Sequence, residues 1–234
     1  MLKSVFLIAI LILLTLENFG QQRLGIGIAG RIGNSWASFP MGQLQFNKRV
    51  PETAFGLAVY HMSTKHFGLQ AEINYANKGY KIGKEYSSFG LPDSGWTYSR
   101  SINYIEIPLL THVEIGKGRF HIIANLGPQF SYAISSSETF NQNVTSFTGI
   151  KTGDIYISNT KTNGFQFGLA VGGGINYRFN FGIIQLEARY YLGLSNIIPP
   201  RKYSNFQNQH FGATISYYYL VPIRKKEKEA TETP

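Results

Sequence analysis

The sequence predicts an all-β fold: an eight-stranded antiparallel transmembrane β-barrel with short periplasmic turns and long extracellular loops. Three observations support this prediction. Apolar and polar residues alternate along several segments, the connections between these segments are alternately short and long, and an export signal precedes them. The composition agrees, because charged residues make up only 15% of the 234 residues and aromatic residues also reach 15%. An ordinary soluble domain has about 25% charged residues.

The N-terminus has the pattern of a signal peptide. Lys3 supplies a positive charge, residues 5–14 are apolar without interruption, and residues 15–20 turn polar and end on Gly20. This order predicts a signal peptide at 1–20. The alternative is an uncleaved anchor, but the apolar stretch is shorter than the roughly 20 residues that a span needs. We therefore expect a barrel domain over 21–222, followed by a charged flexible tail at 223–234.

Strict alternation identifies the strands. In residues 185–192 one face reads Leu, Ala, Tyr, Leu and the other reads Gln, Glu, Arg, Tyr. A period of two residues indicates a strand with one apolar face. The same pattern recurs along the chain and predicts eight strands, at about 23–33, 53–62, 66–82, 99–115, 119–133, 163–178, 182–194 and 209–221.

The connections alternate in length. Tight turns are expected at 63–65, 116–118 and 180–181, and long polar connections at 34–52, 83–98, 134–162 and 195–208. An even number of strands with short turns at one end and long loops at the other is typical of an outer-membrane barrel. A soluble sandwich has no reason for this asymmetry.

The alternation also predicts which side chains enter the barrel. A basic side chain facing lipid at the membrane midplane costs about 2–4 kcal/mol, so the apolar faces must point outward. This sends six charged residues into the lumen, where we expect a structural charge network in a closed interior: Arg31, Glu72, Glu106, Arg178, Glu187 and Arg189. Seven tyrosines near strand ends are expected to form interfacial girdles: Tyr75, Tyr80, Tyr132, Tyr177, Tyr190, Tyr217 and Tyr219.

Several strand motifs resemble those of the PorT-like outer-membrane β-barrel proteins. Residues 69–81 are similar to an "lQxElxYxxKGxk" strand of that family, and residues 104–110 to its "YxEIPLL" strand. Further similar motifs are Gly127-Pro128, the glycines at 172–174, and Arg189-Tyr190 with residues 193–196. The resemblance runs in order from about Leu24 to Tyr219. One departure is that the chain continues for 15 residues beyond Tyr219, whereas outer-membrane barrels commonly end on an aromatic residue.

The resemblance implies an eight-strand barrel in a Gram-negative outer membrane, but no single activity. The family's namesake serves type IX secretion, and the motifs matched here belong to the scaffold. We therefore expect a non-enzymatic envelope protein, structural or adaptor-like, that acts through its loops or periplasmic face. One alternative is a component of a type IX-like secretion machine. Another is a ligand-binding or small-channel barrel.

No catalytic, cofactor or metal site is expected. The chain has no Cys, which excludes disulfides and thiol chemistry. The GxGxxG run at 25–30 lies within a predicted strand, whereas a dinucleotide site needs it between a strand and a helix. The five histidines are expected to be solvated residues at turns and strand ends: His61, His66, His112, His121 and His210.

The expected partners are outer-membrane lipid and lipopolysaccharide, with envelope or secretion proteins as further candidates and no nucleic acid. The predicted outer connections carry basic residues that would suit lipopolysaccharide phosphates. Generic solubility charge is the alternative interpretation. These residues are Lys48, Arg49, Lys78, Lys81, Lys84, Arg100, Arg201 and Lys202. The Ser- and Asn-rich connection at 134–162 is the first place to look for an extracellular ligand.

Overall fold

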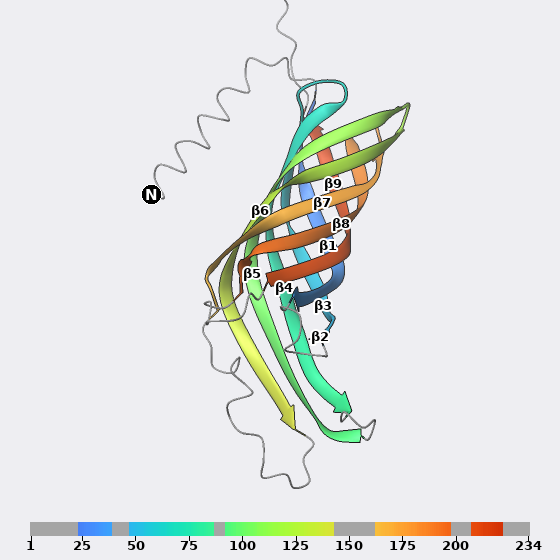
Figure 1. Ribbon diagram of the computed structural model, residues 1–234. Helices are drawn as coiled ribbons and strands as arrows, with labels where there is room; N and C mark the ends of the chain where they lie inside the picture. The colour runs from blue at the N-terminus through green and yellow to red at the C-terminus, as the bar shows by residue number, and fades with distance from the viewer. Residues whose placement is uncertain (1–22, 39–46, 87–91, 143–161, 198–206, 222–234) are drawn as a thin grey trace, which may run out of the picture.

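The computed structural model describes residues 23–38, 47–86, 92–142, 162–197 and 207–221, which form antiparallel strands wrapped into a barrel (Figure 1). The predicted signal peptide and tail lie outside the described residues. The strands are β1 (Arg23–Ser38), β2 (Asn47–Lys48), β3 (Val50–Met62), β4 (Phe67–Tyr86), β5 (Pro92–Lys117), β6 (Phe120–Gln142), β7 (Phe165–Arg178), β8 (Gly182–Asn196) and β9 (Gln207–Val221). In the described part of the chain, no helix is both long enough and apolar enough to cross a membrane.

The sheet closes on itself. Neighbouring strands follow the order β2-β4-β3-β1-β9-β8-β7-β6-β5, and β5 also pairs with β4. The first and last long strands meet in the wall, with Leu24 opposite Val221. The two-residue strand β2 pairs only briefly with β4 and does not count as a separate strand of the barrel. The closed antiparallel barrel of eight long strands confirms the predicted fold.

Three tight turns join strands at one end of the barrel, as predicted. Residues 63–66 connect β3 to β4, residues 118–119 connect β5 to β6, and residues 179–181 connect β7 to β8. Gly118 has a φ of 67°, a left-handed conformation that L-residues with side chains seldom adopt. A glycine is therefore well suited to the β5–β6 turn.

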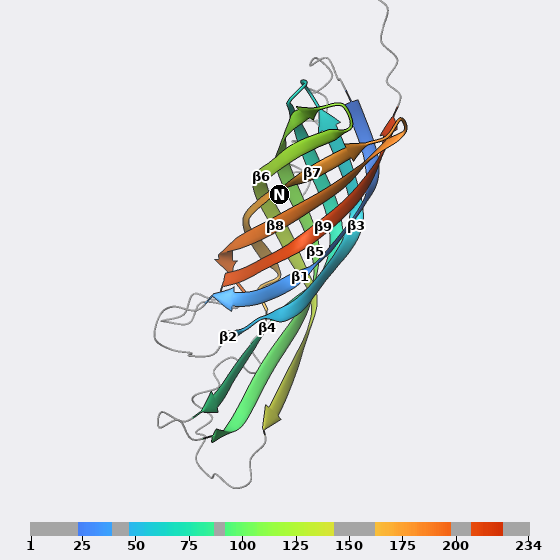
Figure 2. The same cartoon turned by 90° about the vertical axis from the view of Figure 1, so that its right-hand side faces the viewer.

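Strands β4, β5 and β6 run well past the barrel and form a three-stranded extension (Figures 1 and 2). Pairing of β4 with β5 continues to Tyr86 opposite Pro92, and pairing of β5 with β6 continues to Trp96 opposite Gln142. By contrast, β6 pairs with β7 only as far as Tyr132. The prediction of loops at 83–98 and 134–162 is therefore wrong for 83–86, 92–98 and 134–142, which are strand.

The physical reason is that the extension lies beyond the apolar wall. Ser135, Ser136 and Ser137 of β6 are all exposed, so no apolar face alternates with a polar one here. Backbone pairing continues without the period-two signal by which strands are recognised.

Candidate functional site

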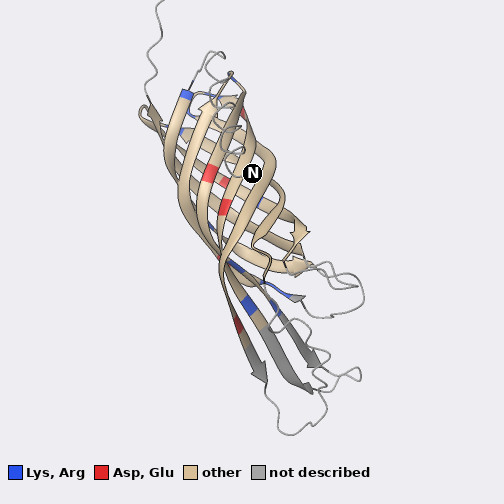
Figure 3. Cartoon of the chain, turned by 90° about the vertical axis from the view of Figure 1, so that its left-hand side faces the viewer, with Lys and Arg blue, Asp and Glu red and all other residues tan. Residues whose placement is uncertain are grey.

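The barrel is apolar outside and polar inside. Its outer wall carries large exposed side chains on every long strand, such as Ile28 on β1, Leu57 on β3 and Leu186 on β8. The interior instead holds buried Arg, Lys, Glu, Gln and Asn. Charged residues therefore form only a few bands on the barrel strands (Figure 3). This arrangement inverts that of a soluble protein and suits a wall that faces hydrocarbon.

One group of charges, the Arg31 cluster, joins β1, β3, β4 and β5. Arg31 donates from Nε to Oε1 of Glu52 at 2.8 Å and from Nη2 to Oε2 of Glu106 at 2.7 Å. The ammonium group of Lys78 forms an ion pair with Glu106 and lies 4.7 Å from the ring centroid of Tyr191. Two bases thus face two acids in a fully buried site, so each charge is compensated.

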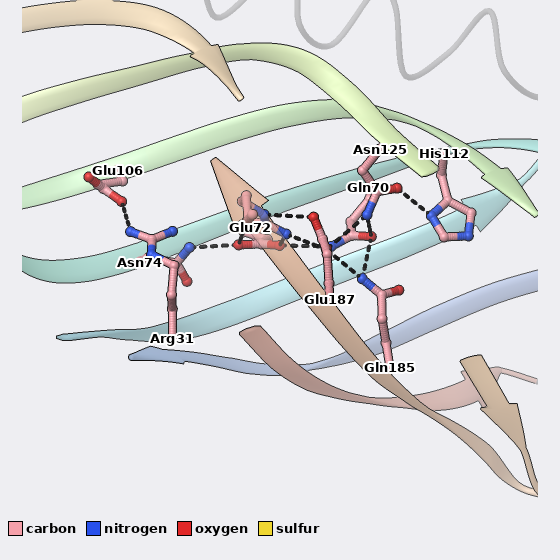
Figure 4. A network of polar contacts seen from close by, with 10 residues as sticks. Arg31, Gln70, Glu72, Asn74, Glu106, His112, Asn125, Gln185 and Glu187 are labelled. Atoms are coloured by element: carbon pink, nitrogen blue, oxygen red, sulfur yellow. Dashed lines mark hydrogen bonds and ion pairs between the residues drawn. The ribbon is translucent and has the colours of Figure 1, made fainter. Parts of the chain in front are cut away.

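A second group, the Arg189 cluster, joins β8 to β4 across the lumen. Arg189 donates from Nη1 and Nη2 to the two oxygens of Glu72, at 2.9 and 2.7 Å, and from Nε to Glu187 at 2.9 Å. The remaining lone pairs of the two carboxylates accept bonds from amide side chains of Gln70, Asn74, Asn125 and Gln185. Figure 4 shows this network running along the interior from Asn74 to Gln185 and His112, with the pair of Arg31 and Glu106 beside it.

A third group lies near the tight turns. Glu114 accepts a hydrogen bond from the hydroxyl of Tyr60 at 2.7 Å and forms an ion pair with Arg178. The Nδ1 atom of His121 stands 3.6 Å from the same carboxylate. This group occupies the end of the lumen opposite to the extension, so the three groups together span the barrel.

The six residues predicted to face the lumen all lie on its inner side. Five are fully buried, whereas Arg178 keeps 19% of its side chain exposed at the barrel end. The structure brings five of them together in three contacts: Arg31 with Glu106, and Arg189 with both Glu72 and Glu187. Arg178 contacts none of these carboxylates and pairs with Glu114.

Sequence reasoning missed Glu52, Lys78 and Glu114. Glu52 falls in the predicted connection at 34–52, but β3 begins at Val50. Lys78 and Arg100 belong to the predicted basic outer connections, but both are buried on the inner face. The sequence does contain a signal for each of the three. Side chains an even number of positions apart on one strand share a face, and each of these residues is an even number of positions from an inward-facing residue of its own strand. On β4, for example, Lys78 is six positions from Glu72, so both side chains point into the barrel.

Four of the five histidines are buried, so the expectation of solvated histidines is wrong for them. His112 and His210 are completely buried, and His61 and His121 nearly so, while His66 is half-buried. His112 donates from Nδ1 to Oδ1 of Asn125 at 2.7 Å, inside the polar network. Within the described residues, no group of three or more His, Cys, Asp or Glu is placed to hold a metal ion.

Tyrosines occupy both faces of the wall. Tyr132 and Tyr219 are more than half exposed, as an interfacial girdle requires. Tyr80 is an exception to the predicted girdle, because it is buried inside the barrel. Four further tyrosines fill the lumen between the charged groups: Tyr60, Tyr104, Tyr191 and Tyr218. The interior is thus packed with aromatic rings as well as ion pairs.

The glycine motif at 25–30 lies within β1 and not at a strand–helix junction. Gly25 and Gly27 face the inside of the barrel, whereas Gly30 faces outward. The motif therefore has the backbone of a strand and not that of a dinucleotide-binding loop.

Comparisons with known proteins agree with this architecture. A family model described as an outer membrane protein beta-barrel domain matches residues 19–199. No curated protein sequence matches the chain significantly. Among solved structures, Ail of Yersinia pestis is 11% identical, with 84% of this chain and 98% of that chain covered at a TM-score of 0.40.

Two other solved structures are similar to the same extent. OprG from Pseudomonas aeruginosa is 14% identical, with 86% of this chain and 95% of that chain covered at a TM-score of 0.46. The outer membrane protease OmpT from Escherichia coli is 8% identical, with 87% of this chain and 98% of that chain covered at a TM-score of 0.37. These likenesses concern the barrel fold alone.

Proposed function

Because this chain belongs to the family of outer membrane protein beta-barrel domains, we propose that it is a non-enzymatic structural or adaptor protein that acts through surfaces outside the lipid. It is an eight-stranded barrel of the outer membrane. The observation that supports the proposed role is the interior, which is crossed by paired buried charges. Because the lumen is filled in this way, the surfaces that remain for binding a partner are those at the two ends of the barrel.

The charge network argues against transport through the lumen. The ion pair between Arg31 and Glu106 and the bidentate pair between Arg189 and Glu72 both connect strands across the interior. Breaking a buried pair by removing one partner typically costs about 3–5 kcal/mol. Opening a path would require several such pairs to separate, so a resting conductance is not expected.

The polar contacts also favour a non-enzymatic protein. Among the described residues, the hydroxyl of Ser63 lies 3.3 Å from Nδ1 of His61, which superficially suggests a nucleophile and its base. Nε2 of His61, however, has no hydrogen-bond partner in the described part of the chain. A catalytic base of this kind needs a third group to orient it. We therefore assign this pair to the β3–β4 turn.

The extension offers the most prominent surface for a partner. In the described chain, β7 stops pairing at Tyr132, and β6 continues to Gln142 with one edge uncovered. Backbone groups on an uncovered strand edge can pair with a strand of another protein. This edge therefore suits an adaptor that binds an envelope protein by strand addition.

The narrower PorT-like kinship is also part of the proposal. Its motifs at 69–81 and 104–110 fall on β4 and β5, where they supply Glu72 and Glu106 to the lumen. These positions support a shared scaffold. They do not favour the secretion role of the family's namesake over another adaptor role.

The role can be tested by co-purification from the native outer membrane in mild detergent. A variant in which residues 79–101 are replaced by Asn-Gly would remove the strands that hold the free part of β6, because Lys78 and Ile102 are opposite each other and can close a hairpin. β6 beyond Ser136 would then have no strand of β5 to pair with and would no longer offer a strand edge. We expect the complete chain to retain a stoichiometric partner and the shortened chain to lose it. A control variant, Lys117→Ser with Arg119→Ser, changes the opposite end and should retain the partner.

Two results would contradict the proposal. One is a partner that remains bound to the shortened chain at full stoichiometry. The other is a steady single-channel conductance of the purified barrel in a planar bilayer, which would instead favour the small-channel alternative. If the partner were a secretion protein, the result would favour the alternative in which the chain is a component of a type IX-like secretion machine.

A further inference from the structure

The outer wall of β3, β4, β5 and β6 changes abruptly from apolar to polar. The strand register aligns one row of apolar side chains across these strands: Phe55, Tyr75, Ile105 and Tyr132. Toward the extension, the next row on the same face is polar: Thr53, Asn77, Asn103 and Ser135. The step between the rows is two residues, about 7 Å, on β3, β4 and β5. On β6 it is three residues, because the register shifts opposite Asn103 and Tyr104. The aromatic row thus marks where the hydrocarbon of the outer leaflet ends.

The polar row is held together by hydrogen bonds between side chains. Asn77 donates to Oδ1 of Asn103 at 2.6 Å, and Asn103 donates to Oγ of Ser135 at 2.9 Å. The amides are therefore fixed in a line across three strands. This line faces outward at the level where lipid headgroups begin.

A hollow of about 120 Å³ lies beside this row, on the side toward the extension. Gly79 forms part of its floor, and its backbone N–H and C=O are both bonded to the hydroxyl of Ser35 at 2.9 Å. A Cβ atom at Gly79 would lie 2.1 Å from the carbonyl oxygen of Arg100, so only glycine fits at this position of the floor. Hydroxyl and amide groups line the hollow: Asn77, Ser99, Ser101, Ser137 and Thr139.

Two lysines stand two rows beyond the polar row, past the row of Gly79 and Ser101. Lys48 of β2 and Lys81 of β4 are directly opposite each other, so their side chains share one face of the sheet. Lys81 has the same parity as Asn77 and is opposite Ser99, which lines the hollow. Figure 3 shows basic residues on the strands where the extension leaves the barrel. A positive site thus adjoins a hydroxyl-lined hollow above the aromatic row.

We propose that this outer face binds the phosphorylated sugar headgroup of lipopolysaccharide in the outer leaflet. The two lysines provide charge for a phosphate, and their long side chains can reach back toward the membrane. The amides and hydroxyls of the hollow suit sugar hydroxyl groups. Lipid is the occupant that the position selects, because the hollow lies next to the row at which the hydrocarbon ends. This inference rests on the outer-membrane location and not on the adaptor role.

The test is a titration of the refolded full chain in detergent with purified lipopolysaccharide, read as bound lipid per barrel by native mass spectrometry. The double variant Lys48→Gln with Lys81→Gln should bind about 10- to 30-fold more weakly, since each basic residue near an anionic surface contributes about 1 kcal/mol. The matched control is Lys65→Gln with Lys117→Gln, which removes the same charge at the opposite turns. It should bind like the unchanged chain.

A second variant tests the hollow itself. Ser101→Val with Ser137→Val should weaken binding of both native and phosphatase-treated lipopolysaccharide, whereas the lysine variant should lose its effect on the treated lipid. Equal weakening by the two lysine variants would overturn the proposal, because the effect would then be one of net charge. Equal binding of phosphatidylglycerol would also overturn it. The gel shift between unboiled and boiled protein verifies that each variant is folded.

Discussion

Arg189 shows how the barrel tolerates charge in its interior. Its guanidinium is completely buried, and all three of its nitrogens donate to carboxylates, in bonds of 2.7–2.9 Å. The planar donor fork matches carboxylate geometry, which lysine would not do. Because one base here serves two acids, Glu72 and Glu187, its loss would leave two buried negative charges facing each other.

We therefore expect Arg189→Met to lower the free energy of unfolding by about 3–5 kcal/mol. The measurement is urea unfolding in lipid vesicles, followed by the gel shift of folded barrel. Adding Glu72→Gln and Glu187→Gln to the same chain should restore most of the loss, because no unpaired charge then remains. Arg178→Met is the control, since that side chain is partly exposed and its loss should matter less. An equal effect of Arg178→Met and Arg189→Met would contradict this explanation.

The inward position of most charged residues was predictable from the sequence, but their partners were not. Alternation alone places Arg31 and Glu106 inside. It cannot show that they meet, because they are 75 positions apart and the contact depends on how the strands are staggered around the barrel. The same holds for Arg178, which pairs with Glu114 and with none of the predicted acids.

Among the elements, the β5–β6 hairpin depends on a single residue for its turn. Gly118 has a φ of 67° and no atom within 4 Å of where a side chain would begin, so only the backbone conformation restricts substitution. A left-handed conformation costs an ordinary L-residue roughly 1–2 kcal/mol, while Asn adopts it more readily.

Gly118→Val should therefore destabilise the barrel by about 1–2 kcal/mol, and Gly118→Asn should have a much smaller effect. Equilibrium unfolding of the two variants under the same lipid conditions measures the difference. If the two substitutions were equally harmful, crowding and not backbone conformation would have to be the cause.

Strand centres were easier to predict than strand ends. β8 was expected at 182–194 and is observed at Gly182–Asn196, because Leu186 and its neighbours alternate clearly between lipid and lumen. β6 was expected to end near 133 and reaches Gln142. Beyond Tyr132 both faces meet water, so hydrogen bonding defines the strand and hydrophobicity gives no sign of it.

For the whole molecule, closure and extension are separate features. β4 and β5 close the barrel through pairs from Phe67 opposite Val113 to Lys78 opposite Ile102, all on the barrel side of the extension. The even number of strands made closure predictable, whereas the extension left no periodic signal. The lipopolysaccharide site was not predictable either, because it depends on cross-strand register.

Replacing residues 79–101 by Asn-Gly should accordingly leave the barrel intact. The shortened chain should keep its gel shift, and its thermal unfolding midpoint should stay within a few degrees of that of the complete chain. Heating of membrane fractions before electrophoresis would measure this midpoint. Loss of the shift would mean that the extension is needed for closure.

The ion pairs of the lumen also bear on the order of assembly. Arg189 lies 117 positions from Glu72, so β8 must arrive before this carboxylate of the N-terminal half is neutralised. Until then, the half-formed sheet carries an unpaired charge at Glu72, which lipid cannot solvate. Insertion into the membrane and curling of the sheet are therefore a concerted event, in which the last strand to dock completes the pairing of the first.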